Sequence, residues 1–124
     1  MKKIKLNLGS GNDYKEGWIN VDADKDTRKD IYADLSKKFP FRENYADEIM
    51  ASDILEHFIK EEGGMFLEEC WRVLKINGKI TIRTHNLYKI FEKFKENNVE
   101  IPFPQRDLHL KSWFEEKNIS SDPI

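Results

Sequence analysis

Two short apolar segments, one ending in a glycine turn and the other in an acid, constrain the fold of this chain most. They are Leu6-Asn-Leu-Gly-Ser-Gly-Asn12 and Trp18-Ile-Asn-Val-Asp-Ala-Asp24. Two parallel strands whose carboxyl ends carry a glycine turn and a carboxylate form a nucleoside site in open α/β sheets. Glycines let the backbone approach a ligand closely, because a Cβ would occupy that space. We therefore expect Asp22 to bind ribose hydroxyls beside the turn Gly9-Ser-Gly11.

The spacing of this motif distinguishes among nucleoside ligands. A dinucleotide site has the pattern G-x-G-x-x-G opening a full helix, with its acid about twenty residues further on. Here Tyr14 stands at the third glycine position, and Asp22 follows Gly11 much more closely. The interval from Gly9 to Gly17 is also shorter than a parallel crossover of about a dozen residues. A ligand with a ribose and no phosphates fits better, and S-adenosylmethionine is the common one.

Apolar segments bounded by polar ones predict five strands. They are expected over residues 3–8, 18–21, 30–33, 47–52 and 79–84. The first is interpreted as the central strand, and the fourth as a short buried strand of the kind found in parallel sheets. Residues 36–44 contain a proline and lack periodicity, which indicates an irregular connection held on the core by Phe39 and Phe41.

Apolar positions at helical spacing predict two helices between and after these strands. One follows Gly63-Gly64 and ends at Asn77-Gly78, as a left-handed helix end requires. The other spans about residues 87–94. Strands that alternate with helices imply a single α/β domain over 1–124, with a parallel sheet and right-handed crossovers.

Composition narrows the class of protein. The 124 residues carry 21 Lys and Arg against 23 Asp and Glu, a net charge of −2, which argues against a general nucleic-acid binder. The lysine clusters at 2, 3 and 5 and at 89, 93 and 95 are interpreted as solvated faces. Cys70 is the one cysteine, so no intrachain disulfide is possible. No apolar signal core or membrane-length segment is present, so we expect a soluble cytoplasmic protein.

Further motifs follow the first two in order. They are Asp34-Leu35, Pro40-Phe41, Ser52-Asp-Ile-Leu-Glu-His57 and Glu69-Cys-Trp-Arg-Val-Leu-Lys-Ile-Asn-Gly78. Together, between about Lys3 and Asn86, these motifs resemble a small class I S-adenosylmethionine-dependent methyltransferase of the group called methyltransferase type 11. The resemblance implies a Rossmann-like sheet with strand order 3-2-1-4-5. Most such enzymes add an antiparallel strand pair at the end, and this chain is expected to lack that pair.

The resemblance also implies the site. Its glycine turn would line the methionine part of the cofactor, Asp34 and Leu35 would lie beside the adenine, and the segment after the fourth strand would hold the methyl end. The implied cofactor-binding residues are Leu8, Gly9, Ser10, Gly11, Asp22, Ala23, Asp34, Leu35, Ser52, Asp53 and His57. His57 and Asp53 are the catalytic candidates. A histidine with a near-neutral pKa could take a proton from an attacking hydroxyl or amine.

Simpler roles remain open for these residues. The glycines could form an ordinary tight turn, Asp22 could cap a helix, Asp34 could cap whatever segment follows it, and His57 could only pack or hydrogen-bond near the cofactor. His85 and Asn86, just past the fifth strand, lie at the same edge by topology. The three histidines and Cys70 show no metal-ligand spacing, so no metal site is expected.

The function expected is methyl transfer from S-adenosylmethionine to a small-molecule or sugar-type acceptor. The methyl donor is already activated, so aligning the acceptor, the methyl group and the sulfur supplies much of the rate acceleration. The motifs therefore describe cofactor binding and do not identify the acceptor. One alternative is a cofactor-binding module without its own catalysis, working in an assembly. A nicotinamide oxidoreductase is a second alternative, opposed by Tyr14 and the short crossover.

The C-terminal part, 86–124, is expected to be a helix and a tail. Ser112 with Glu115 forms a capping-box pattern, which predicts a last short helix through about Ile119. The strand over 79–84 would then be an open edge that invites another chain. We expect either a homodimer, or a tail whose Phe103, Trp113 and Phe114 cover this edge.

Overall fold

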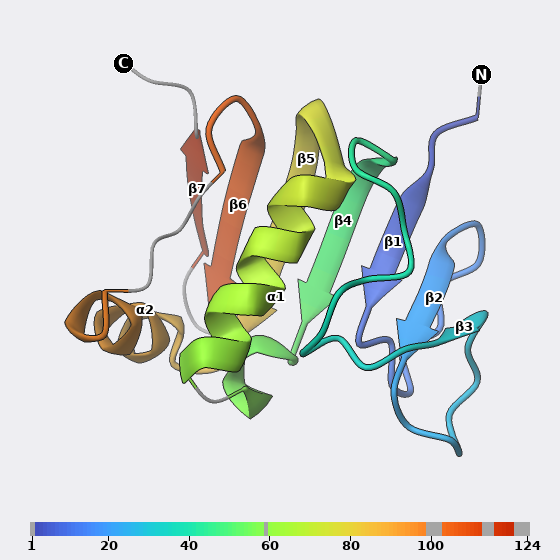
Figure 1. Cartoon of the computed structure of the whole chain (residues 1–124), viewed down its shortest axis with the longest axis horizontal. Coiled ribbons are helices and arrows are strands. Elements are labelled where there is room, and N and C mark those ends of the chain that lie inside the picture. The colour runs from blue at the N-terminus through green and yellow to red at the C-terminus, as the bar shows by residue number, and fades with distance from the viewer. Residues whose placement is uncertain (1, 59, 99–102, 113–115, 121–124) are drawn as a thin grey trace.

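A computed structural model describes residues 2–58, 60–98, 103–112 and 116–120. Within these residues, seven strands form one sheet in the order β3-β2-β1-β4-β5-β6-β7 (Figure 1). All neighbouring strands are parallel except β6 and β7. The strands are β1 Lys5–Leu8, β2 Ile19–Asp22, β3 Ile31–Tyr32, β4 Ala46–Ser52, β5 Leu74–Thr84, β6 Asp107–Ser112 and β7 Glu116–Ser120. The helices are α1 Lys60–Val73 and α2 Leu87–Glu96, with one 3₁₀ turn, η1, at Leu55–His57.

The predicted order of the first five strands, 3-2-1-4-5, is confirmed. The expected absence of a terminal strand pair is wrong, because β6 pairs with β5 and β7 pairs antiparallel with β6. The alternating sequence of β6 explains the pairing, since Leu108 and Leu110 lie on the same face as Ile80 and Ile82 of β5 and are buried with them. The edge of β5 is therefore covered by its own chain.

The capping-box prediction fails for the same reason. Ser112 ends strand β6, and strand β7 over Glu116–Ser120 occupies described residues where the helix through Ile119 was expected. Glu115, Trp113 and Phe114 lie outside the described residues, whereas Phe103 is buried in the core. The homodimer stays a prediction.

Only one face of the sheet is apolar. Leu6, Ile49, Ile80 and Leu108 lie side by side in one row, and Leu8, Ala51, Ile82 and Leu110 lie in the next. All eight are buried and share one core with residues of α1 and α2, and α1 lies across this face (Figure 1).

The opposite face carries mostly polar side chains at the alternate positions. Lys5, Glu48, Lys79 and Asp107 form one row, and Asn7, Thr81 and His109, with the apolar Met50 among them, form the next. Strand β4 is therefore half-buried, and not the fully buried strand predicted.

The start of β5 also differs from its prediction. Helix α1 ends at Val73, and Asn77-Gly78 lies within β5 at an irregularity in its pairing with β4. Asn77 has a left-handed φ of 66°, and its amide donates to the Gln105 carbonyl at 2.8 Å. A Cβ on Gly78 would approach the Lys75 carbonyl oxygen to 2.8 Å. The Asn-Gly pair thus forms a bulge that admits the loop before β6.

An ion pair on α1 fixes the connection between β3 and β4. Glu69 accepts from the backbone amide of Phe39 at 2.7 Å and from Arg72 Nε at 2.7 Å. Phe39 is buried against Phe66, with ring centroids 5.7 Å apart. Phe41 stacks on Tyr45. The irregular segment is held on the core as predicted. In the described residues, neither helix combines the length and the apolarity that crossing a membrane requires.

Candidate functional site

The glycine turn follows β1 at the carboxyl edge of the sheet. The backbone amides of Gly9 and Ser10 both donate to the Val21 carbonyl, at 2.8 and 3.1 Å, which ties the turn to β2. Gly9 and Gly11 have φ values of 69° and 49°, a conformation that residues with a Cβ seldom adopt. The turn is thus a fixed structure that requires glycine at both positions.

The two glycines leave space for different neighbours. A Cβ on Gly9 would lie 2.7 Å from Ile54 Cδ1, so this glycine makes room for a side chain from the segment after β4. A Cβ on Gly11 would meet nothing within 4 Å. The space at Gly9 is therefore taken by Ile54, whereas the space at Gly11 is open, and ligand binding at either glycine stays a prediction.

Ser10, between these glycines, has an unsatisfied polar atom. Its side chain is 4% exposed, and its Oγ is buried with no hydrogen-bond partner in the described part of the chain. Buried hydroxyls are nearly always paired. The missing partner is what a polar ligand on the turn would provide, and the amino-acid part of S-adenosylmethionine has such groups.

Asp22 ends β2 beside this turn, as the sequence predicted. Its carboxylate is half-buried, and Oδ2 accepts a hydrogen bond from Thr27 Oγ1 at 2.6 Å. Among the described residues, Oδ1 receives no hydrogen bond, so it remains available for a ribose hydroxyl. Thr27, which the sequence reasoning missed, fixes the carboxylate from the loop after β2.

The residues expected beside the adenine differ in exposure. Leu35 is 3% exposed and belongs to the core, whereas Ala23 is exposed. Asp34 is exposed, and its Oδ1 accepts from the Ser36 hydroxyl at 2.6 Å and the Ser36 amide at 3.0 Å. These hydrogen bonds from Ser36 lower the pKa of Asp34. Asp34 therefore caps a local turn, the simpler role left open for it, and its Oδ1 is already occupied.

The segment after β4 brings the catalytic candidates to the same edge. Ser52 is half-buried at the end of β4, and Asp53 and His57 are exposed. Asp53 has a left-handed φ of 57°, and its amide donates to the Arg83 carbonyl at 2.8 Å. Buried Leu55 anchors η1, which carries His57.

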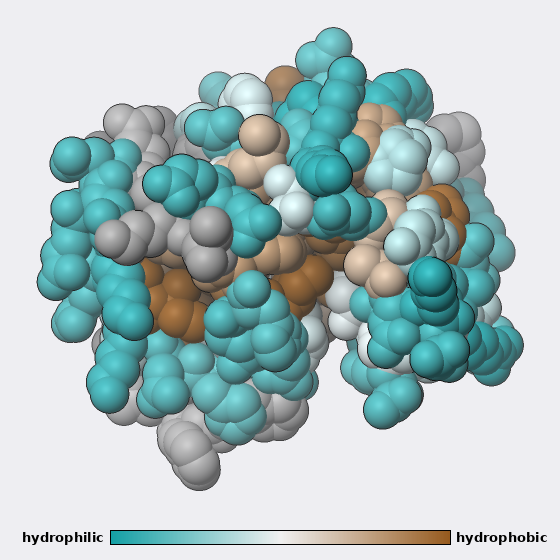
Figure 2. All heavy atoms as spheres, turned by 60° about the horizontal axis from the view of Figure 1, so that its bottom comes forward, coloured by the Kyte–Doolittle hydropathy of each residue, from teal (hydrophilic) through white to brown (hydrophobic). Residues whose placement is uncertain are grey.

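Other side chains complete this edge. His85 and Asn86 are exposed just past β5, and Leu8 is fully buried beneath the glycine turn. Figure 2 is turned to bring this edge forward, and it shows hydrophobic residues between hydrophilic lobes. The carboxyl ends of β1, β2, β4 and β5 thus gather polar groups around a partly apolar surface.

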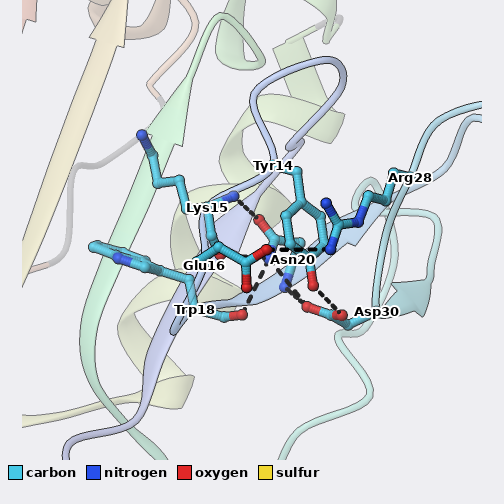
Figure 3. Close-up of polar contacts among 7 residues, drawn as sticks. All are labelled: Tyr14, Lys15, Glu16, Trp18, Asn20, Arg28 and Asp30. Carbon is cyan, nitrogen blue, oxygen red and sulfur yellow. Dashed lines mark hydrogen bonds and ion pairs between the residues drawn. The ribbon is translucent and has the colours of Figure 1, made fainter.

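The crossover from β1 to β2 has no helix, and a buried asparagine holds it instead (Figure 3). Asn20 is fully buried. Its Oδ1 accepts from the Lys15 amide and from Asn7 Nδ2, both at 2.9 Å. Its Nδ2 donates to the Lys15 and Trp18 carbonyls and to Asp30 Oδ2 at 2.9 to 3.0 Å. Sequence reasoning missed this network, although asparagines in the middle of two apolar strands were a visible signal.

Cys70 was considered with the histidines as a possible metal site. Cys70 is in the core, where burial raises the pKa of its thiol well above the usual range. Within the described ranges, no three His, Cys, Asp or Glu side chains are grouped so that they could hold a metal ion.

Comparison with known proteins identifies the family. Residues 8–82 match the sequence profile of a family described as methyltransferase domain. The structure of the PH0226 protein from Pyrococcus horikoshii OT3 superposes with a TM-score of 0.58 at 24% identity, over 80% of this chain and 54% of that one. A SAM-dependent methyltransferase from Archaeoglobus fulgidus gives a TM-score of 0.58 at 20% identity, over 82% of this chain and 54% of that one. No curated protein matches the chain.

These similarities differ in what they establish. At 24% and 20% identity the two structures share the fold with this protein, and the chain spans about half of their length. The family profile covers more than half of the 124 residues and includes the glycine turn, Asp22 and the segment after β4. The chain therefore belongs to the methyltransferase domain family.

Proposed function

We propose that this protein transfers the methyl group of S-adenosylmethionine to a small-molecule or sugar-type acceptor. Family membership indicates S-adenosylmethionine as the cofactor. The observation that carries the proposal is the unpaired, buried Ser10 Oγ in a glycine turn that is open at Gly11. The proposal includes a cytoplasmic location and an acceptor that is neither nucleic acid nor membrane, in keeping with the near-balanced charge.

Three segments of the chain would each bind a different part of S-adenosylmethionine. The free Oδ1 of Asp22 would accept a hydrogen bond from the ribose, with Thr27 holding the carboxylate in place. Ser10 Oγ and the exposed backbone around Gly11 would bind the methionine part. Ala23 and Leu35 would flank the adenine. Most of these groups are fixed by hydrogen bonds before the cofactor arrives, which reduces the entropy lost on binding.

The cofactor supplies a methyl group on a sulfonium, so the protein has to orient the acceptor and manage its proton. His57 and Asp53 are exposed at the end of β4, where an acceptor hydroxyl or amine can reach them. His57 would take the acceptor's proton. The left-handed backbone of Asp53, held by the Arg83 carbonyl, fixes how this segment leaves β4.

A second candidate function is a cofactor-binding module that works in an assembly. The observation that favours it is that the chain spans about half the length of the structures it matches. In that case Gly11, Ser10 and Asp22 would still bind the cofactor, and a partner would supply the acceptor site. A homodimer is one form of such an assembly.

Calorimetry with S-adenosylmethionine and S-adenosylhomocysteine tests the proposal, with NAD and ATP as comparison ligands. Asp22→Ala should weaken binding about ten- to a hundred-fold, because a hydrogen bond to a charged group contributes about 1.5–3 kcal/mol. Asp24→Ala, which removes an exposed acid two residues away, is the matched control. Failure of the wild-type protein to bind either sulfur compound would refute both candidate functions. Binding without transfer to a panel of acceptors would favour the assembly.

A further inference from the structure

A hollow lies at the edge of the sheet opposite the glycine turn. It is open, has a volume of about 450 Å³, and is formed at the amino ends of β1 and β2 and just before β3. Its lining includes Lys2, Lys3, Lys5, Tyr14, Trp18 and Asp30. Its volume falls within the range of small-molecule sites. Strand β1 is four residues long, so about 13 Å separates this hollow from the cofactor edge.

The walls of the hollow are fixed by the network around Asn20 (Figure 3). The Tyr14 hydroxyl donates to Asp30 Oδ1 at 2.8 Å, and the guanidinium carbon of Arg28 lies 3.7 Å from the centre of the Tyr14 ring. The Trp18 carbonyl accepts from Asn20 Nδ2 at 3.0 Å. The two aromatic residues therefore belong to a structured crossover, and a ligand would not have to order them.

The charges around the hollow are mainly positive. In the described part of the chain, Lys2, Lys3 and Lys5 form no ion pair, and Lys5 Nζ lies 5.4 Å from the centre of the Trp18 ring. The carboxylate of Asp30 is already engaged, because it accepts from Tyr14 and twice from Asn20. Two carboxylates lie near these lysines, Asp47 near Lys3 and Glu48 opposite Lys5, but neither lines the hollow.

The remaining lining is mainly apolar and includes half-buried Ile4 and Ile19. Apolar and basic groups in one hollow suit a ligand with a flat hydrophobic body and an anionic group. Trp18 offers a ring for stacking, and lysines attract anions without demanding a fixed geometry.

We propose that this hollow binds a small organic anion that carries a flat apolar ring. The ring lies against Trp18, and the anionic group lies among Lys2, Lys3 and Lys5. The site is separate from methyl transfer, because the strand length places it too far from the glycine turn for a ligand to reach both.

Nuclear magnetic resonance titration with three probes tests this proposal on the full chain. The probes are 2-naphthalenesulfonate, which has ring and charge, 2-naphthol, which keeps the ring, and inorganic sulfate, which keeps the charge. The sulfonate should shift the amide signals of Gly17, Trp18 and Ile19 and leave those of Gly11 and Asp22 unchanged. It should bind at least tenfold more tightly than either partial probe. Equal affinity for the sulfonate and the naphthol would overturn the proposal.

Two triple variants with equal charge change provide the controls. Lys2→Gln, Lys3→Gln and Lys5→Gln together should weaken sulfonate binding about tenfold, because three exposed charge interactions are lost. Lys89→Gln, Lys93→Gln and Lys95→Gln, which alter exposed lysines on α2, should change it less than about twofold. Equal weakening in both variants would mean that only net charge matters, and would refute the site. Affinity for S-adenosylhomocysteine should be the same in both, so failure of this inference is distinguishable from failure of the proposed function.

Discussion

Replacing Asn20 by leucine should loosen the crossover that carries the glycine turn. The side chain of Asn20 makes five hydrogen bonds, to Asn7, Lys15, Trp18 and Asp30, from a fully buried position. A net contribution of about 1 kcal/mol per bond gives an upper estimate of about 5 kcal/mol. Lys15 and Asp30 are near enough to the surface to regain water, which lowers the expected loss to about 3–4 kcal/mol.

This loss is a large fraction of the stability of a small domain, typically about 5–15 kcal/mol. Urea unfolding monitored by circular dichroism should therefore show a much lower midpoint for Asn20→Leu with a similar slope. Asn12→Leu replaces an exposed asparagine in the same crossover and should leave the midpoint nearly unchanged. An unchanged midpoint for Asn20→Leu would refute the view that this network holds the crossover.

The network should also matter to the cofactor. Lys15 and Trp18 fix the end of the crossover, and the amides of Gly9 and Ser10 fix its beginning on the Val21 carbonyl. At a temperature where Asn20→Leu is still folded, its affinity for S-adenosylhomocysteine should fall by about tenfold or more, since the turn is no longer preorganised. Reduced stability with full affinity would show that the crossover does not position the turn.

Three further predictions concern the glycines, Glu69 and Arg106. Gly9→Ala should destabilise the protein more than Gly11→Ala in thermal unfolding, because both lose a left-handed glycine but only the first meets Ile54 at 2.7 Å. The hydrogen bond from Arg72 lowers the pKa of Glu69 in the folded protein. The ionised Glu69 therefore stabilises the fold fully above its pKa in the unfolded chain, and this contribution is lost as the pH falls through its pKa in the folded protein. Glu69→Gln should flatten this acid dependence of the urea midpoint. Arg106 donates to the Leu74 and Pro104 carbonyls, so Arg106→Leu should speed hydrogen exchange in β6 more than in β1.

The parts of the fold that follow local patterns were predictable from the sequence. The order of β1 to β5 was implied by the family resemblance that the ordered motifs carry, and α1 and α2 followed from apolar residues at helical intervals. The last two strands were not predictable in this way, because Ser112 and Glu115 gave a local helix signal. Pairing with the open edge of β5 outweighed that signal, since it pairs the backbone of 107–112 and buries Leu108 and Leu110.

The same division applies to the candidate site. The turn at Gly9 and the acid at Asp22 lie within one short stretch of sequence, so their pairing could be predicted from it. The contact of Ile54 with Gly9 depends on β4 lying beside β1, with Ala51 opposite Leu8, which is a long-range arrangement. No local pattern indicates such a contact.

The polar face of the sheet bears on where ligands and partners can bind. Parallel sheets are normally covered on both faces, and their strands are then apolar throughout. Here no described helix covers the second face. One of its rows, Lys5, Glu48, Lys79 and Asp107, alternates in charge across four neighbouring strands, so adjacent side chains attract each other.

Thr81, on the same face, is only 3% exposed, so neighbouring side chains already shield the backbone beneath them. A partner laid over this face would have to desolvate these charges and would gain little apolar contact in return. The edges of the sheet are different, because the carboxyl edge holds the unpaired Ser10 hydroxyl and the amino edge holds the hollow beside Trp18. Recognition by this domain should therefore take place at the two ends of its strands, and not across its open face.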